Sequence, residues 1–318
     1  MEIKDTIGSL GIIPVIKIDD AEKAIKLAQA LIRGGLPVAE ITFRTNAAKE
    51  SIKRIVSNFP NMLVGAGTVL CVKNVRDAVN AGASFIVTPG FNPKVVDYCI
   101  AEDISIFPGV NSPSEIEQGL ERGLKVLKYF PAEASGGIKA IKAVAAAYGD
   151  ILFIPTGGIN QTNICDYLSV SNVLACGGSW MVKSELISSG EFQKITELTE
   201  EAVKTVLGFE FAHIGINSKS EKHAAEGADR FKDLFGFLSK VGNSSIFSGT
   251  SIEIMKKLYL GSHGHIAVRT NRISLAISYL GRRGFQIREE TKKTKNGKLV
   301  AVYLEEEIAG FAIHLVQK

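Results

Sequence analysis

Eight short apolar segments alternate with helical stretches through the first two thirds of the chain, and this alternation constrains the fold more than any other feature. The apolar segments are residues 12–18, 38–43, 63–68, 85–90, 104–110, 126–131, 151–158 and 173–178. They are apolar on both faces, as parallel strands covered by helices require. Eight strand–helix units in about 200 residues predict an α/β fold, a (β/α)8 TIM barrel, with a doubly wound open sheet as the alternative.

Residue usage changes near position 208. All four cysteines precede this point and all five histidines follow it. Lys and Arg number 20 against 22 Asp and Glu before it, and 17 against 11 after it. Residues 197–207 have a helical pattern, and Gly208 is a helix stop signal. We therefore predict a barrel domain over residues 1–207 and a smaller α+β domain over residues 208–318.

The composition predicts a cytoplasmic protein. The 318 residues are 46% hydrophobic with a net charge of +4. No apolar run approaches the roughly 20 residues that span a bilayer, and the N-terminus lacks a signal-peptide pattern, so we expect no membrane partner. The excess of positive charge in the second domain would be compatible with nucleic-acid binding. However, "TKKTKNGK" (291–298) is typical of a solvated hairpin, and no aromatic residues are interleaved with its basic ones. We therefore expect no nucleic-acid partner.

Polar side chains recur where the predicted strands end. In a barrel these ends carry the chemistry, because their loops converge on one mouth. The residues near these ends are Lys17, Glu40, Arg44, Thr68, Pro89, Pro108, Lys128, Phe130 and Thr156. Each by itself is compatible with a solvated loop residue, but together they predict a functional site at this end of the barrel.

Glycines follow the last two predicted strands, in "PTGGI" (155–159) and "CGGSW" (176–180). Glycines there expose backbone N–H groups, and beside helix N-termini such groups suit an anion, especially phosphate. The loops after strands seven and eight are also the usual phosphate position in barrels. We predict a phosphate site in these two turns; the alternative is that the glycines only make tight turns.

Lys128 lies inside the apolar segment "VLKYFP" (126–131). A lysine is seldom fully buried unless it is paired or has a chemical role. An apolar slot favours the neutral amine, which can attack a ketone and form a Schiff base that withdraws electrons from the adjacent carbon. We predict that Lys128 is this nucleophile. The alternative is a lysine that extends to the surface and pairs with Glu133.

Breaking a carbon–carbon bond next to a Schiff base also requires a base that moves protons. Glu40, near the end of the second strand, is the candidate. Arg44 lies one turn further on and can grip a carboxylate through its fork of donors. Thr68 can donate a further hydrogen bond.

Eight short motifs lie in order between residues 5 and 205. They are "EITFRT" (40–45), "GAGTV" (65–69), "TPG" (88–90), "PGV" (108–110), "LKYFPAE" (127–133), "GGIKA" (136–140), "PTGGI" (155–159) and "GGSW" (177–180). Together they resemble the bacterial 2-keto-3-deoxy-6-phosphogluconate aldolases, which also act as 4-hydroxy-2-oxoglutarate aldolases. The resemblance implies a class I aldolase in which Lys128 forms the Schiff base and Glu40 transfers protons.

The resemblance and the strand ends together predict the substrate contacts. These are Arg44, Thr68, Pro89, Phe130, Lys17, Thr156, Gly157, Gly158, Gly178 and Ser179. By the family pattern, Arg44 and Thr68 bind the pyruvate carboxylate and Phe130 lies beside the lysine. The four residues Gly157, Gly158, Gly178 and Ser179 correspond to phosphate contacts. Lys17 stands where some family members carry an arginine near the distal anion.

The implied reaction is reversible cleavage of 2-dehydro-3-deoxy-6-phosphogluconate to pyruvate and glyceraldehyde 3-phosphate. Cleavage of 4-hydroxy-2-oxoglutarate to pyruvate and glyoxylate is the implied second activity. We expect no cofactor for the aldolase, because the iminium serves as the electron sink. The resemblance also implies a homo-oligomer, a trimer. The alternative function is a phosphate-binding isomerase or synthase on the same barrel, without Schiff-base chemistry.

The second domain contains an internal repeat, a signal that identifies a duplicated module. "FAHIGIN" (211–217) is similar to "HGHIAVR" (263–269), and each is followed by a helical pattern, 226–237 and 272–285. Each half closes with a strand, 249–255 and 309–316. The predicted order is β-α-β-β-β, twice, with "KNGK" (295–298) as a hairpin turn.

This order resembles the vicinal oxygen chelate superfamily, the glyoxalase and bleomycin-resistance-like proteins. In that superfamily, equivalent positions on the first and last strands of each half can hold a divalent metal. Those positions are here His213, Glu253, His265 and His314. Their nitrogen and carboxylate donors suit zinc, nickel, iron or manganese. His314 departs from the glyoxalase pattern, which usually has glutamate there.

Three roles for the second domain stay open at this stage. It is a metal-dependent enzyme acting on a small oxo compound, a binding module that senses a metabolite or stabilises oligomers, or a retained fold whose histidines are half-buried sheet residues. The first role, as a glyoxalase-like enzyme, also accompanies the isomerase or synthase alternative for the barrel.

Overall fold

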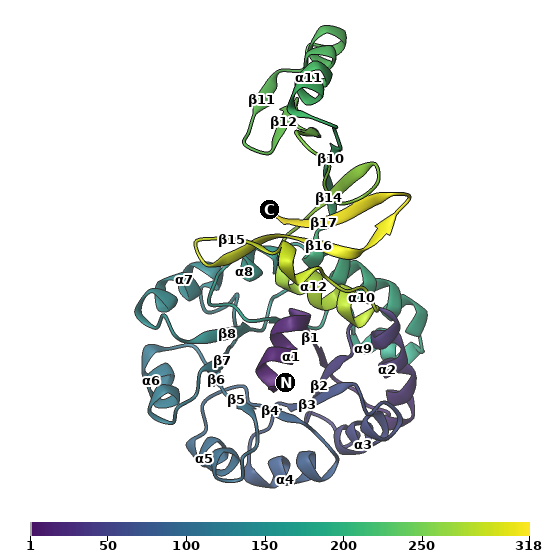
Figure 1. Cartoon of the computed structure of the whole chain (residues 1–318). Coiled ribbons are helices and arrows are strands. Elements are labelled where there is room, and N and C mark those ends of the chain that lie inside the picture. Colours follow the sequence, from purple (N-terminus) through teal and green to yellow (C-terminus); the bar gives the residue numbers. More distant parts are fainter. Residues whose placement is uncertain (1) are drawn as a thin grey trace. The chain divides into compact units, whose positions relative to one another are not determined.

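The computed structural model describes residues 2–318 and divides the chain into two compact units. The first ends at Val206 and the second runs over Leu207–Lys318, so the predicted break lies one residue later than the observed one. Figure 1 labels the elements of both units. Among the described residues, no helix combines the length and apolar character needed to cross a membrane.

The first unit is built on short parallel strands. They are β1 (Ile12–Ile16), β2 (Val38–Thr42), β3 (Leu63–Gly67), β4 (Phe85–Val87), β5 (Ile106–Phe107), β6 (Gly109–Val110), β7 (Val126–Tyr129), β8 (Leu152–Pro155) and β9 (Cys176–Gly178). One ladder has the order β5-β4-β3-β2-β1-β9 and another the order β6-β7-β8. Proline cannot donate to a ladder, and Pro108 divides the predicted fifth strand into β5 and β6.

The parallel sheet closes on itself. β1 pairs with both β2 and β9, and a parallel bridge between Thr156 and Gly177 joins the end of β8 to β9. This closure excludes the doubly wound open sheet and agrees with the predicted barrel. The predicted segments at 85–90 and 151–158 extend beyond the observed strands, since β4 ends at Val87 and β8 at Pro155. The residues that follow are turns that carry candidate site residues.

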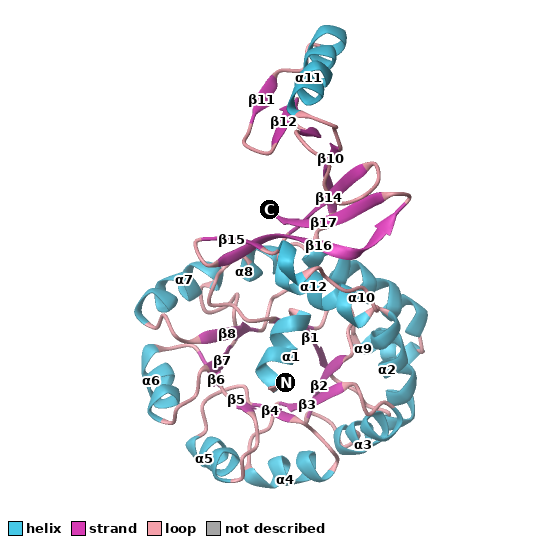
Figure 2. Cartoon of the chain, in the orientation of Figure 1, coloured by secondary structure: helices cyan, strands magenta, loops and turns pink. Residues whose placement is uncertain are grey.

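Helices form a ring around the strands of this unit, except α1, which lies over the centre of the ring in Figure 2. They are α1 (Ile3–Leu10), the 3-10 turn η1 (Ala21–Lys23), α2 (Ala24–Arg33), α3 (Ala48–Asn58), α4 (Val72–Asn80), α5 (Pro93–Ala101), α6 (Pro113–Glu121), α7 (Gly137–Ala147), α8 (Ile164–Leu168), α9 (Ser184–Ser189) and α10 (Phe192–Leu207). α2 buries Leu27, Ala28 and Leu31 on one face, the 3.6-residue pattern of a helix packed on a sheet. α6 begins with a Ser112–Glu115 capping box, which satisfies its first N–H groups.

The second unit contains one eight-stranded sheet. Its elements are β10 (Glu210–Ile216), α11 (Glu221–Phe235), β11 (Ser239–Val241), β12 (Ser245–Ser248), β13 (Ile252–Met255), β14 (Gly264–Thr270), α12 (Ile273–Arg282), the 3-10 turn η2 (Glu289–Thr291), β15 (Lys293–Lys295), β16 (Lys298–Ile308) and β17 (Phe311–Gln317). The strand order is β11-β12-β13-β10-β14-β17-β16-β15. This is β-α-β-β-β twice, the predicted order, with β10 and β14 antiparallel at the centre.

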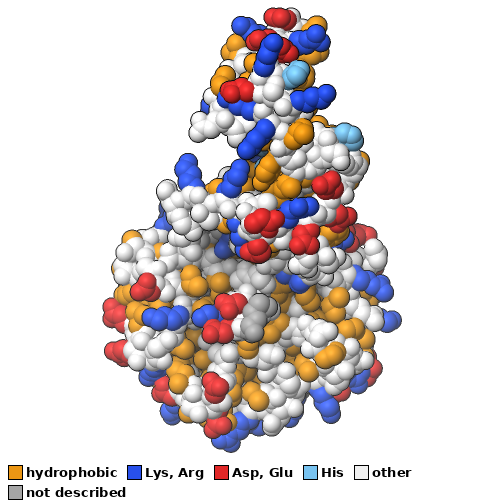
Figure 3. All heavy atoms as spheres, in the orientation of Figure 1, with side chains coloured by type: hydrophobic (Ala, Val, Ile, Leu, Met, Phe, Trp, Pro, Cys, Tyr) orange, Lys and Arg blue, Asp and Glu red, His pale blue; other side chains and the backbone are white. Residues whose placement is uncertain are grey.

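Local side-chain packing and turn geometry stabilise the elements of these two halves. α11 packs Ala224 and Ala228 against Ile246 and Ile254 of the sheet. Residues 296–297 have positive φ, as the predicted hairpin turn between β15 and β16 requires. Lys and Arg side chains are frequent on the face of this unit seen in Figure 3, in line with its excess of positive charge.

Candidate functional site

Lys128 and Glu40 form a buried pair inside the barrel. Lys128 lies in β7 and is 5% exposed, and Glu40 lies in β2 and is 2% exposed. Lys128 Nζ donates a hydrogen bond of 3.3 Å to Glu40 Oε1. The same Nζ lies 5.2 Å from the centroid of the Phe130 ring. The structure therefore joins three residues that the sequence analysis selected separately.

The alternative account of Lys128 is wrong. Lys128 does not extend to the surface, and its partner is not Glu133. The Glu133 carboxylate instead accepts a hydrogen bond from the Tyr167 hydroxyl. Glu133 N also donates to the Gly157 carbonyl at 3.1 Å, so this residue ties the loop after β7 to the loop after β8.

One glycine of β3, Gly67, makes room for the Glu40 carboxylate, a role that the sequence analysis missed. Gly65 is the register partner of Glu40 in the β2–β3 ladder, but a Cβ placed on it would lie 2.2 Å from the Phe85 ring. A Cβ atom placed on Gly67 would lie 2.1 Å from Glu40 Oε1. Glycine inside a strand often marks such a close approach, and "GAG" (65–67) in a predicted strand was the available signal.

Arg44 and Thr68 follow the ends of β2 and β3, on the same side of the barrel as Glu40. Arg44 Nε donates to Thr42 Oγ1 at 3.2 Å, and that hydroxyl donates to the Ile16 carbonyl at 2.7 Å. Among residues 2–318, no carboxylate forms an ion pair with Arg44, so its guanidinium is available to an external acid group. Thr68 has φ 53°, an uncommon backbone conformation for a β-branched residue and one often found at functional sites.

The two glycine turns lie side by side at the ends of β8 and β9. Gly157 and Gly158 have φ 98° and 82°, and Thr156 is bridged to Gly177. A Cβ on Gly177 would lie 2.3 Å from Thr156 Oγ1. Within the described part of the chain, the backbone N–H groups of Gly158 and Ser179 donate to no acceptor. Two free donors at adjoining turns suit an anion.

One part of the phosphate prediction is wrong. The glycines were expected beside helix N-termini, but the helices after these turns, α8 and α9, begin only at Ile164 and Ser184. The donors are therefore those of the turns themselves. A Cβ on Gly178 would lie 1.9 Å from the Trp180 ring, so this glycine provides space for the indole.

The other predicted residues lie near this end of the barrel in different settings. Lys17 follows β1 and forms a 2.9 Å ion pair with Asp19, with both side chains largely exposed. Pro89 follows β4, and a Cβ on Gly109 would lie 2.2 Å from its carbonyl oxygen. Pro89 thus packs directly on β6, which neighbours the lysine strand β7.

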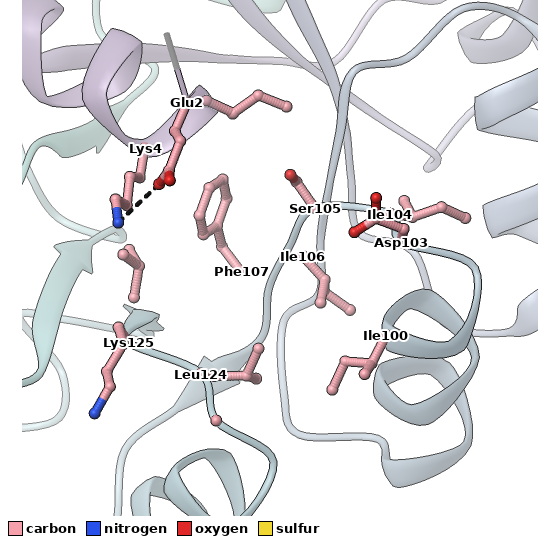
Figure 4. A pocket seen from close by; sticks show the side chains of 13 residues that line it. Glu2, Lys4, Ile100, Asp103, Ile104, Ser105, Ile106, Phe107, Leu124 and Lys125 are labelled. Carbon is pink, nitrogen blue, oxygen red and sulfur yellow. Dashed lines mark ion pairs between the residues drawn. The ribbon is translucent and has the colours of Figure 1, made fainter.

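A hollow of about 440 Å³ lies at the opposite, amino-terminal end of the strands (Figure 4). It is lined by the start of α1, where Lys4 and Glu2 form a 2.8 Å ion pair, and by the residues just before β5 and β7. Chemistry in barrels is found at the carboxyl-terminal end of the strands. This hollow is therefore separate from the Lys128 site.

The barrel matches a known family over most of its length. The model of the KDPG and KHG aldolases, the 2-keto-3-deoxy-6-phosphogluconate and 4-hydroxy-2-oxoglutarate aldolases, matches residues 3–198. The chain belongs to this aldolase family. The resemblance found in the sequence motifs is thereby confirmed.

Two curated relatives of the aldolase chain show the extent of the match. A 2-dehydro-3-deoxy-phosphogluconate aldolase of Haemophilus influenzae is 46% identical over 205 residues, which are 64% of this chain and 97% of the relative. A KHG/KDPG aldolase of Escherichia coli is 40% identical over 193 residues, 61% of this chain and 91% of the relative.

Solved structures agree with these relatives. A KDPG aldolase of Legionella pneumophila, with pyruvate captured as a covalent carbinolamine intermediate, is 39% identical with a TM-score of 0.62. It aligns with 64% of this chain and 98% of its own. The Zymomonas mobilis aldolase with 3-phosphoglycerate is 39% identical with a TM-score of 0.59, over 64% and 96% of the two chains. The family model ends before the second unit of this aldolase begins.

The second unit of the aldolase chain brings its four predicted ligands together. Glu253 Oε2 lies 3.0 Å from His213 Nε2 and 3.1 Å from His265 Nε2. These two Nε2 atoms are themselves 3.1 Å apart. Nitrogens of His213, His265 and His314 all lie within 4.8 Å of one another. His223 and His263 lie outside this cluster and bond Ser220 and the Ala309 carbonyl instead.

Strand register explains the convergence. Gly215 stands between Glu253 on β13 and His265 on β14. In the next row of the same face, Ala267 stands between His213 on β10 and His314 on β17. A Cβ on Gly215 would lie 2.0 Å from the His265 ring, so the small central residue is what lets the two side chains meet. The repeated sequence His-Ile-Gly and His-Ile-Ala carries this arrangement.

The electrostatics of the cluster favour a neutral imidazole at His314 and an ionised carboxylate at Glu253. Burial, together with the neighbouring imidazoles of His265 and His213, lowers the pKa of His314 to about 3. Burial alone would raise the pKa of Glu253, but hydrogen bonds from the two imidazoles and from Ser245 Oγ hold it well below its usual range. These are the protonation states in which both groups bind metal ions.

Proposed function

We propose that the barrel is a class I aldolase that cleaves 2-dehydro-3-deoxy-6-phosphogluconate to pyruvate and glyceraldehyde 3-phosphate. We propose cleavage of 4-hydroxy-2-oxoglutarate to pyruvate and glyoxylate as its second activity. The observation that carries this proposal is the buried hydrogen bond between Lys128 and Glu40 at the active-site end of the barrel. The names of the family and of its relatives support the choice of substrates.

In the proposed mechanism, Lys128 Nζ attacks the C2 ketone of the substrate. A carbinolamine forms and loses water to give an iminium, with Glu40, already at hydrogen-bond distance, carrying the protons. Arg44, whose guanidinium has no carboxylate partner among the described residues, binds the C1 carboxylate, assisted by Thr68. The Phe130 ring covers one side of the amine and limits the access of water.

The iminium then accepts the electrons of the broken bond. Glu40 removes the proton from the C4 hydroxyl, the C3–C4 bond breaks, and its electron pair forms an enamine on the lysine side while the aldehyde departs. Protonation of C3 restores the iminium, and a water molecule hydrolyses it to pyruvate and free Lys128. The water lost in the first step is thus regained in the last.

A substrate assay tests this function. The full chain is supplied with each of the two substrates, and pyruvate release is followed with a coupled dehydrogenase. We expect pyruvate from both, with a preference for the phosphorylated substrate because Gly158 and Ser179 offer two free N–H donors to its phosphate. Release from neither substrate would contradict the aldolase and leave the isomerase or synthase as the better proposal.

We propose further that the second unit is a metal-binding module of the vicinal oxygen chelate type, with His213, Glu253, His265 and His314 as ligands. Donors around one ion at metal–ligand distances of about 2.0–2.2 Å are about 3–3.5 Å apart. The donor atoms of His213, His265 and Glu253 are 3.0–3.1 Å apart, and the nitrogens of the three imidazoles lie within 4.8 Å of one another. His314 supports the proposal as well, because both of its ring nitrogens are buried without a partner among the described residues.

The donor set fits zinc, nickel, iron or manganese. A divalent ion held there would polarise a carbonyl oxygen. The chain's own contribution is orientation. Ser245 Oγ holds the second oxygen of Glu253 at 2.5 Å, and the Tyr303 ring packs 4.5 Å from that of His314. Glutamate in place of His314 is the usual glyoxalase pattern, so a third imidazole sets this site apart.

Metal content and thermal stability test this module. We expect the full chain to bind about one divalent ion, and an ion at 100 times its Kd to stabilise the second unit by about 2.7 kcal/mol. His314→Ala should weaken metal affinity at least about 100-fold, whereas His263→Ala, an exposed histidine outside the cluster, should not change it. Metal-free, chelator-insensitive protein would favour the binding or assembly role instead.

The trimer and the cytoplasmic location stay predictions. The first follows from the family resemblance and the second from the composition and the N-terminal sequence.

A further inference from the structure

A cavity of about 370 Å³ lies next to the four-residue cluster of the second unit. The imidazoles of His213, His265 and His314 and the carboxylate of Glu253 form part of its lining. Aromatic rings of Phe247, Tyr259 and Tyr303 form another part. This volume is within the range of small-molecule sites, which combine apolar walls with a few convergent polar groups.

The charges that line this cavity are unbalanced. Its carboxylate, Glu253, is already bonded to two imidazoles and a serine. Two ammonium groups, of Lys257 and Lys293, also line it, and neither is paired with a carboxylate of the described chain.

Lys257 and Lys293 are exposed, and each follows a lysine that does have an acidic partner. Lys256 forms a 2.6 Å ion pair with Glu221, and Lys292 forms one of 2.6 Å with Glu289. Thus Lys256 and Lys292, outside the cavity, each form an ion pair with a glutamate, whereas Lys257 and Lys293, which line the cavity, form none with the described residues. A divalent ion in the cluster would add two further positive charges.

We propose that this cavity binds a small carboxylate with an oxygen on the neighbouring carbon, a 2-oxo or 2-hydroxy acid. Its carboxylate lies toward Lys257 and Lys293, and its second oxygen lies toward the His–Glu cluster. The inference rests on the proposed metal site. It identifies the ligand by its chemistry: the two lysines favour an anion, the His–Glu cluster favours a second oxygen donor, and the cavity of about 370 Å³ has room for both groups.

This class of ligand includes pyruvate and glyoxylate, the products proposed for the barrel. The second unit would then bind or transform a compound that the first releases. This placement follows from the chemistry of the two sites and requires no contact between them.

The test uses the full chain with Lys128→Gln, so that the barrel cannot trap a keto acid covalently. The protein is loaded with Co²⁺, whose visible absorption reports on the cluster, and is titrated with pyruvate and with pyruvamide, its neutral analogue. We expect pyruvate to bind at least about tenfold more tightly. Lys257→Gln and Lys293→Gln should each weaken pyruvate binding about tenfold and leave pyruvamide binding unchanged.

Lys295→Gln is the matched control, because this lysine is on the same strand as Lys293 but does not line the cavity. Inorganic phosphate is added as a competitor. Equal binding of pyruvate and pyruvamide, equal effects of the control and the cavity lysines, or complete displacement by stoichiometric phosphate would each overturn the proposal.

The same samples separate this inference from the metal site. If Co²⁺ binds and the lysine variants keep it, any failure belongs to the carboxylate proposal. If Co²⁺ does not bind, the metal proposal fails. Calorimetric titration with pyruvate then tests whether the cavity binds a carboxylate without a metal ion. Tighter binding of pyruvate that depends on Lys257 and Lys293 would support a metal-independent carboxylate site, and its absence would overturn the inference.

Discussion

Replacing Lys128 by alanine should lower kcat/KM for pyruvate release at least about 10⁴-fold, since the covalent route is lost. With pyruvate and borohydride, the wild-type chain should gain one pyruvyl group, located on Lys128 by peptide mass spectrometry. The variant should gain none at this site. Cleavage at the native rate by the variant, or an adduct on another lysine, would contradict the proposed nucleophile.

Two further variants keep this result interpretable. Removing Lys128 leaves Glu40 buried without its partner, which can cost about 3–5 kcal/mol of stability. Lys128→Gln retains a hydrogen-bond donor for the carboxylate and should be equally inactive while remaining folded. Lys125→Gln changes an exposed lysine just before the same strand and should leave both activity and labelling intact.

Glu40→Gln should lower kcat about 10²–10⁴-fold, the range lost with a general acid–base group. The amide oxygen can still accept a hydrogen bond from Lys128, so the variant should fold, but it cannot carry the protons. Steady-state kinetics and the rate of borohydride trapping measure the effect. Unchanged kcat in a folded variant would remove Glu40 from the mechanism.

Gly67→Ala provides an independent measurement of the same role, because it displaces the carboxylate without removing it. The added Cβ would lie 2.1 Å from Glu40 Oε1, so the side chain must move. A displacement of about 1 Å in a catalytic group can cost about 10²-fold in rate. Gly149→Ala has open space for a Cβ and serves as the control.

The barrel could be predicted from the sequence because each strand–helix unit carries its own pattern. Segments apolar on both faces, with helical periodicity between them, have few compact solutions. Strand ends were predicted less well, as at Pro108 and after Val87, because pairing stops where neighbouring strands stop. The end of each strand therefore depends on neighbouring strands that are distant in the sequence.

The candidate active-site residues could be selected from the sequence, but their connections could not. Lys128 was identified as an amine in an apolar strand, and Glu133, five residues away, was a plausible partner by proximity. The closed sheet instead brings Glu40 to it, 88 residues earlier in the chain. The space for this pair comes from Gly67 on a third strand; the glycine is visible in the sequence, but the side chain that it makes room for is not.

The sequence alone determined the kinds of group available: an apolar-strand lysine, an acid, an arginine, two glycine turns and a repeated histidine motif. These follow from local composition and period, which each segment carries by itself. Only the tertiary structure decided which of them meet. In both units, strand register sets which side chains share a face, and register depends on packing between segments far apart in the chain.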